Sequence, residues 1–396
     1  MVVERALRGA PPHGLLDSLR VNLARHYGAT DVGLLLADYG LVTLRPFDRT
    51  AVGGPVSVES SPAGKAFSAQ QPYLSTGPGL MVTVHLPVTV RGDRYGVLTV
   101  TLPEDGSPES VQDLEAISEM LGHALRVAER HTDVYRQARR ERRLTAPAEM
   151  QWQLLPGRTC RRDEFDLHAY WEPVYASRGH LFDWSASADQ LTLVVASGTG
   201  PGIEDALLNN LALNAIRNAR RSRADLVGQA SLADQALYGQ HGGSRYLPTV
   251  LIGLELRTGT MRIVDAGSPT VWRMRGSQVE RMELEGQLPL GMFEDTVYST
   301  QQLQLLPGDR LLFVACVDGP SSSERDSAGA ATPDDNVVSR AIEATRHLSC
   351  VAAPQAVYRE IWTRGGGGAA DGGSVLCLDW HGRPVRRTEG GYVTAG

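Results

Sequence analysis

The hydrophobic and polar positions of the first hundred residues switch between helical and strand periodicities. Residues 13–27 carry leucines three and four positions apart and end at Gly28, which predicts an amphipathic helix with a glycine cap. Residues 81–90 and 95–101 read as strands on either side of a polar turn and predict a hairpin. Two further strands and a short helix are predicted at 31–37, 40–44 and 63–69. This order of elements predicts an α+β domain.

A long helical pattern follows at 109–144. Its apolar side alternates three and four residues apart over about three heptads, as a coiled-coil seam does. The seam consists of Leu114, Ile117, Leu121, Ala124, Ala128, His131, Tyr135 and Ala138. We expect two such helices to pair in parallel and join two protomers, while a single helix packed on its own domain stays open as the alternative. Pro147 interrupts the pattern, and a short helix is expected at 148–155.

Short strands and turns predominate from residue 165 onward. The strands are predicted at 166–171, 190–196, 249–256, 261–265, 270–275, 278–282, 310–317 and 373–380. The helices are predicted at 203–222, 225–237, 336–347 and 354–363. Because most of these strands pair as hairpins and the helices are grouped apart from them, the pattern predicts a β-sandwich flanked by helices.

One strand, at 190–196, leads through a glycine-rich turn into a helix. Such a junction suits either a phosphate held on a helix N-terminus or a metal held at the end of a strand. The turn lacks the lysine of a phosphate-binding loop, and Glu204 and Asp205 occupy the first turn of the helix. Because these carboxylates would repel a phosphate, the sequence argues against nucleotide binding here.

Composition narrows the function classes. At 396 residues the chain is long enough for two or three domains. A net charge of −6 and a pI near 6.0 argue against a nucleic-acid partner. The cysteines show no CxxC spacing, and no signal peptide or 18-residue apolar run occurs. We therefore expect a cytoplasmic protein with reduced thiols and no membrane partner.

Two resemblances organise these elements. The order of elements over residues 10–130 resembles a GAF sensor domain, and the hairpin around the Arg91–Arg94 turn is similar to that family's central hairpin. From about residue 145 to 380 the chain resembles the SpoIIE/RsbU-type branch of the PPM metal-dependent protein serine/threonine phosphatases. The motifs that carry this second resemblance lie in the family's order at 150–156, 171–176, 247–250, 265–269, 288–291, 307–312 and 317–319. Together the resemblances imply an α+β protein with a GAF-like sensor domain, a helical linker and an α-β-β-α sandwich.

The phosphatase resemblance implies a two-metal site, in which Mn²⁺ or Mg²⁺ ions bridged by acidic residues activate a water for attack on a phosphoserine or phosphothreonine. This sequence departs from the family at several of the matching positions. His180 stands where the first aspartate is expected, although Asp183 of the same motif remains. In the glycine-rich turn, Ser197 replaces the metal-bridging aspartate next to Gly198, and Pro201 replaces a histidine. A serine hydroxyl cannot balance the charge of two dications.

Two acidic positions of the family pattern are retained. Asp318 matches the aspartate of its Thr-Asp-Gly turn, and Asp371 matches the first acid of its closing motif. If any metal is retained, we expect Asp318, Asp371 and His180 to hold it, because imidazole and carboxylate together suit zinc or manganese. The alternative is that Asp318 and Asp371 only cap turns, and we expect Asp183 to be a turn residue.

The function expected from this pattern is that of a signalling regulator without phosphatase activity and without a resident cofactor. Its expected partners are a second copy of the chain and an anti-anti-sigma or anti-sigma type protein, or an active phosphatase. The alternatives are an active Mn- or Mg-dependent phosphatase with a rebuilt site, and a regulator that binds a small molecule in the vacated cleft. The expected boundaries are 10–130 for the GAF-like domain, 109–144 for the helix that continues as linker, 145–160 for a switch-like helix, 161–381 for the phosphatase-like domain and 382–396 for a tail.

Overall fold

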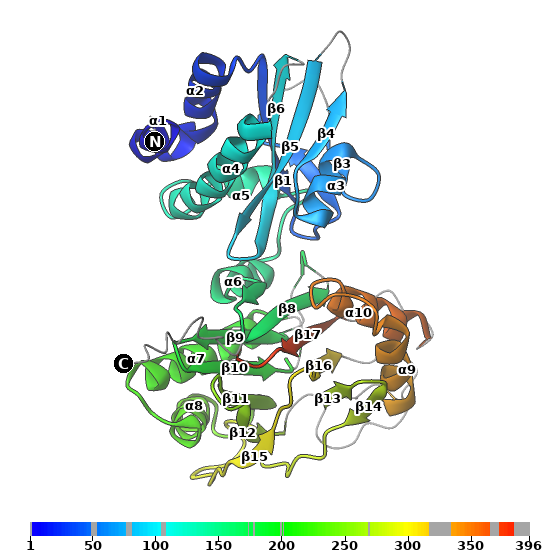
Figure 1. Cartoon of the computed structure of the whole chain (residues 1–396). Helices are drawn as coiled ribbons and strands as arrows, with labels where there is room; N and C mark the ends of the chain where they lie inside the picture. Colours follow the sequence, from blue (N-terminus) through cyan, green and yellow to red (C-terminus); the bar gives the residue numbers. More distant parts are fainter. Residues whose placement is uncertain are drawn as a thin grey trace, which may run out of the picture. The chain divides into compact units, whose positions relative to one another are not determined.

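The computed structural model divides into two compact units, Met1–Leu144 (unit 1) and Thr145–Gly396 (unit 2) (Figure 1). It describes residues 2–48, 54–76, 81–103, 108–172, 174–176, 179–198, 200, 202–267, 270–316, 334–364 and 372–383. Most of the expected tail at 382–396 lies outside the described residues. Whether unit 1 is a GAF domain stays a prediction.

Unit 1 contains a six-stranded antiparallel sheet in the order β3-β2-β1-β6-β5-β4. Its strands are β1 (Asp31–Ala37), β2 (Thr43–Pro46), β3 (Val56–Ser57), β4 (Tyr73–Thr76), β5 (Met81–Val90) and β6 (Asp93–Pro103). Its helices are α1 (Val2–Gly9), α2 (Leu15–Tyr27), α3 (Pro62–Ala69), α4 (Pro108–Ala128) and α5 (Val134–Arg139). α2 and α4 share one apolar core with the sheet, whereas α3 packs in a separate cluster with Phe67 at its centre. The expected hairpin at 81–101 is present, and α1, β3 and β4 were not expected from the sequence.

The long helix expected at 109–144 is two helices. α4 ends at Ala128, turns occupy 129–133, and α5 is a separate helix of six residues. The chain bends because α5 folds back on its own unit, where the Tyr135 ring stacks on Phe47 at 4.8 Å between centroids. The Tyr135 hydroxyl also donates to the carbonyl of Pro12 at 2.7 Å.

The predicted seam therefore packs within unit 1 at its buried positions, which favours the alternative of a helix packed on its own domain. Its buried members line the core of unit 1 itself, and these are Leu114, Ile117, Leu121, Ala128 and Tyr135. A heptad pattern marks an apolar face but does not specify what covers it, and here the sheet covers it. The homodimer stays a prediction, and the buried positions of this seam are not available for its surface.

Unit 2 is a sandwich of two antiparallel sheets. The five-stranded sheet has the order β15-β12-β11-β10-β9, and the six-stranded sheet has the order β14-β13-β16-β17-β8-β7. The strands of the first sheet are β9 (Leu181–Ala186), β10 (Gln190–Ala196), β11 (Thr249–Glu255), β12 (Thr260–Ala266) and β15 (Gln301–Gln304). Those of the second are β7 (Thr159–Arg161), β8 (Phe165–Glu172), β13 (Thr270–Arg275), β14 (Gln278–Arg281), β16 (Arg310–Cys316) and β17 (Gly373–Trp380).

Helices cover both outer faces of the sandwich (Figure 1). They are α6 (Ala146–Leu154), α7 (Ile203–Arg221), α8 (Leu226–His241), α9 (Asp335–Thr345) and α10 (Ala353–Arg364). α7 and α8 pack on the five-stranded sheet, and α9 and α10 pack on the six-stranded sheet. Alternation along the strands separates two cores: Phe313 and Leu378 join the main core, whereas Leu312 and Cys377 pack under α9 and α10. The predicted sandwich flanked by helices is confirmed.

α6 is anchored to unit 2 by its own aromatic side chain. Thr145 caps the helix by accepting from the backbone N–H of Ala148. Trp152 packs on Trp171 of β8 at 4.7 Å between ring centroids, and its Nε1 donates to the carbonyl of Val174 at 2.9 Å. The Arg158 guanidinium lies over both indole rings, at 4.9 and 4.3 Å from their centroids. The helix is therefore part of the folded unit.

Candidate functional site

The described strand ends next to the predicted site positions meet at one end of the sandwich. Antiparallel register pairs Ala196, the last residue of β10, with Leu181 at the start of β9 and with Thr249 at the start of β11. In the other sheet, Gly373 pairs with Cys316 and with the last residue of β8. The short connection from β12 to β13 joins the two sheets at this same end. This end of the sandwich is the candidate site.

Three of the predicted site residues, His180, Ser197 and Gly198, lie at this end of the sandwich. His180 directly precedes β9, and Ser197 and Gly198 directly follow β10. Asp318 and Asp371, which continue β16 and precede β17 in sequence, lie outside the described residues. Their contribution to the site stays a prediction.

The glycine-rich turn is packed against the loop before β9. A Cβ added to Gly198 would lie 2.0 Å from the carbonyl carbon of Gly179, so only glycine fits at position 198. Gly179 has a left-handed φ of +81°, and its carbonyl accepts from the Asn209 side chain of α7 at 2.6 Å. The Ser197 N–H donates to the carbonyl of Pro248 at 3.0 Å. Gly198 of this turn therefore serves close backbone packing.

Asp183 is not a turn residue, because it lies inside β9 and is 1% exposed. One of its carboxylate oxygens lies 2.7 Å from Nη2 of Arg217, and the other lies 2.9 Å from Nη1 of Arg220. Both arginines come from α7, three residues apart and therefore on one face of the helix. Arg217 also donates to the carbonyl of Leu154 at the end of α6, 2.8 Å away. Asp183 thus ties β9 to α7 and, through Arg217, to α6.

His180 is buried, with 3% exposure, and α6 reaches its backbone. The Gln151 side chain donates to the carbonyl of His180 at 2.6 Å, and Gln151 is itself buried. The expected switch-like helix therefore contacts a predicted site residue directly. Sequence reasoning missed Gln151, Asn209 and the two arginines of α7. One signal in the sequence could have indicated such residues, namely a polar side chain on the apolar face of a predicted helix. Asn209 is an example, because it lies on the buried face of α7 with Leu208 and Ala212.

The two acids at the start of α7 share a cation. Arg245 pairs with Glu204 and with Asp205, the latter at 3.4 Å. The Asp205 carboxylate also accepts from the N–H of Gly202 at the helix start, at 3.3 Å. The first turn of α7 is thus occupied by its own carboxylates.

A polar cavity of about 450 Å³ lies beside the β12–β13 connection. Three carboxylates and one guanidinium line it, those of Asp265, Glu283, Asp335 and Arg281. Arg281 pairs with Asp335 at 2.9 Å, which leaves the lining acidic overall. A lining of this charge disfavours an anionic ligand.

These features define the class of protein, which is an α-β-β-α sandwich whose candidate site lies at the strand ends between the two sheets. Residues 187–381 match the family model described as Stage II sporulation protein E (SpoIIE). About half of the chain, all of it in unit 2, is therefore similar to the SpoIIE family. No curated protein matches the chain.

Solved structures with similar folds share little sequence with this chain. The RsbU and RsbW domains of a Mycobacterium tuberculosis protein are 22% identical, with a TM-score of 0.44 over 56% of this chain and 61% of that one. The phosphatase domain of Bacillus subtilis SpoIIE, with a fragment of its regulatory domain, is 12% identical, with a TM-score of 0.45 over 93% and 88% of the two chains. RsbX in complex with magnesium is 12% identical, with a TM-score of 0.41 over 56% and 98%.

Within the described ranges, none of the helices has the length and hydropathy needed to cross a bilayer.

Proposed function

We propose that this protein is a signalling regulator whose SpoIIE-type domain binds partner proteins without hydrolysing phosphoesters. The observation that carries the proposal is the chemistry of the described strand ends. Where the family resemblance expects metal-bridging carboxylates, this chain has the Ser197 hydroxyl and the His180 imidazole. The remaining acid of that set, Asp183, has both carboxylate oxygens on arginine side chains.

Electrostatics supports this proposal. Two unit charges 4 Å apart repel by about 4 kcal/mol at an effective dielectric near 20, and two dications repel by about four times as much. A bridging carboxylate offsets part of that repulsion, and a neutral hydroxyl does not. Arg217 and Arg220 add positive charge behind β9. The described residues therefore do not fit a family-type pair of Mn²⁺ or Mg²⁺ ions.

The partner class follows from the family resemblance. We infer that an anti-anti-sigma or anti-sigma type protein, or an active phosphatase, docks on unit 2, and that the protein acts by partner switching. Gln151 and Arg217 support a role for α6 in transmitting a signal, because they join this helix to the His180 backbone and to the Asp183 pair. A shift of α6 would break both contacts, which couples its position to the candidate site.

Two alternatives remain as separate hypotheses. Retention of Asp318 and Asp371 in the sequence favours a rebuilt site that holds one ion, with His180 as a third ligand. The 450 Å³ cavity favours a regulator that binds a small molecule. Replacement of the family's acids by Ser197 and His180 suggests an anionic ligand, but the acidic lining of this cavity suits a cationic ligand better. We also propose that the protein acts in the cytoplasm.

Phosphatase assays with Mn²⁺ and with Mg²⁺ separate the proposal from the first alternative. The substrates are a phosphoserine peptide and a phosphorylated anti-anti-sigma protein, and binding of that protein is measured in parallel by calorimetry. We expect binding without turnover, and the same result for Asp318→Asn. Turnover that Asp318→Asn abolishes and the exposed control Asp189→Asn retains would establish an active enzyme. Absence of both binding and turnover would remove the proposed partner class.

A further inference from the structure

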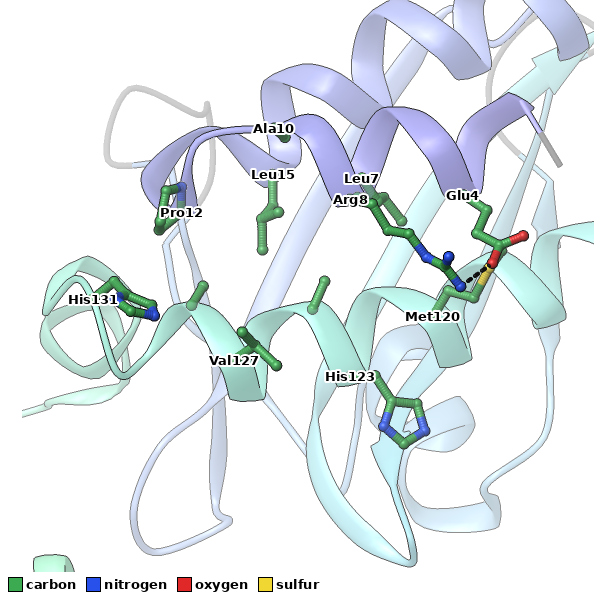
Figure 2. Close-up of a pocket in the computed structure, with 12 residues that line it drawn as sticks. Glu4, Leu7, Arg8, Ala10, Pro12, Leu15, Met120, His123, Val127 and His131 are labelled. Atoms are coloured by element: carbon green, nitrogen blue, oxygen red, sulfur yellow. Dashed lines mark hydrogen bonds and ion pairs between the residues drawn. The ribbon is translucent and has the colours of Figure 1, made fainter.

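Unit 1 carries an apolar groove between α1 and α4. The groove has a volume of about 600 Å³ and is lined chiefly by Leu7, Leu15, Met120, Ala124 and Val127 (Figure 2). Val127, which lines the groove, is 61% exposed. Contiguous apolar surface of this kind marks an interaction site more often than isolated exposed residues do.

The outer face of α4 has a polarised charge pattern. Glu115 and Glu119 are exposed on the N-terminal side of His123, Arg126 is exposed in the last turn of the helix, and Arg130 is exposed just beyond its end. His123 is exposed midway between the two pairs. The helix dipole favours acids in the first turn and bases in the last, but Glu119 lies in the fourth turn. The dipole therefore does not account for the pattern.

Helical geometry separates this face into two rows. At 3.6 residues per turn, Met120 and Val127 lie on the α1 side of His123, and Glu119 and Arg126 lie on the other side. Figure 2 agrees, since Met120 and Val127 border the groove and His123 points away from α1. One row is apolar and the other is charged.

We propose that this face binds the same face of a second copy of the chain, with the two α4 helices antiparallel and crossing at His123. In that arrangement Glu119 of each copy faces Arg126 of the other, because both lie three or four residues from the crossing on the same side. Met120 of each copy likewise faces Val127 of the other, next to the groove. A parallel pair would instead place Glu119 against Glu119 and Arg126 against Arg126. Charge complementarity therefore selects a second copy in the antiparallel orientation.

The proposed contacts between the two copies are compatible with the fold of unit 1. Arg126 donates to the Tyr95 hydroxyl at 2.8 Å, and its side chain stays 55% exposed, so it has further donors for a partner. The sheet-facing side of α4 is not involved. The proposal does not depend on what unit 2 catalyses, so it can fail without affecting the proposed function.

Light scattering of the full chain over a range of concentrations is the first test. We expect a dimer whose dissociation constant rises about tenfold or more in Glu119→Arg, since two ion pairs become two repulsions. The double variant Glu119→Arg with Arg126→Glu should recover most of this affinity. The control Glu59→Arg reverses an exposed charge elsewhere in unit 1 and should have no effect. A monomer mass at every concentration, or equal dissociation constants for Glu119→Arg and Glu59→Arg, would overturn the proposal.

Oxidative cross-linking tests the orientation, with the unsubstituted protein as background. His123→Cys should form a disulfide-linked dimer, because the crossing point faces itself. Glu119→Cys alone should not, since antiparallel packing places the two substituted sites about 12 Å apart along the helix. A mixture of Glu119→Cys with Arg126→Cys should cross-link. Efficient cross-linking of Glu119→Cys alone would show parallel helices and refute the antiparallel arrangement, as would failure of His123→Cys to cross-link.

Discussion

Replacing Asp183 by asparagine tests whether this acid is structural or metal-binding. The substitution removes a buried negative charge that faces Arg217 and Arg220 at 2.7 and 2.9 Å. Breaking a buried ion pair by removing one partner costs about 3–5 kcal/mol, because the other charge stays buried without compensation. Both arginine side chains keep 18% exposure, so water offsets part of the loss and the lower end of that range applies.

We therefore expect Asp183→Asn to destabilise unit 2 by about 3 kcal/mol. For a unit of this size, each kcal/mol lowers the melting temperature by about 2–4 °C, which gives a shift of about 6–12 °C. Differential scanning calorimetry and urea titration measure the change, and Asp189→Asn, in an exposed turn, is the matched control. Replacing Asp183, Arg217 and Arg220 together by apolar residues should recover most of the loss.

A metal-binding Asp183 predicts the opposite result. Neutralising one acid of a metal cluster relieves repulsion in the metal-free protein, so the melting temperature would stay constant or rise. Metal affinity would fall at the same time. An unchanged melting temperature together with a lost calorimetric signal for Mn²⁺ would refute the structural role assigned here to Asp183.

Three further predictions concern single positions. Gly198→Ala should cost about 1–3 kcal/mol in urea titration because its Cβ would meet the Gly179 carbonyl, whereas Gly239→Ala, with open space in α8, should be neutral or stabilising; equal effects would contradict the close packing. Trp152→Ala should cost about 3 kcal/mol and speed hydrogen exchange across α6, and unchanged exchange would show that other contacts hold this helix. Burial lowers the pKa of His85, so the unfolded chain binds more protons below about pH 6.5. Unit 1 should therefore lose stability on acidification, and a pH profile that His85→Gln leaves unchanged would exclude this source.

Much of the architecture could be predicted from local pattern. Hairpin strands such as those at 249–265 and 270–281 carry their turn between them, so pairing follows from adjacency in the chain. β9 was missed because its six residues include Asp183, Trp184 and Ser185, which do not read as an apolar strand. Only the two arginines of α7 make a buried acid tolerable there, and they lie 34 and 37 positions away in sequence.

The sequence by itself determined the sandwich, most of its hairpin strands and helices, and the identities of His180 and Ser197 at positions where the family resemblance expects acids. Tertiary structure decided what those elements face. The apolar side of α4 was visible as a periodicity, but only the sheet of unit 1 shows that a neighbour within the same unit covers it. The glycine-rich turn after β10 looked like a ligand loop until the approach of Gly179 gave Gly198 a packing role. Periodicity reports which side chains avoid water, whereas their partners depend on contacts between distant segments.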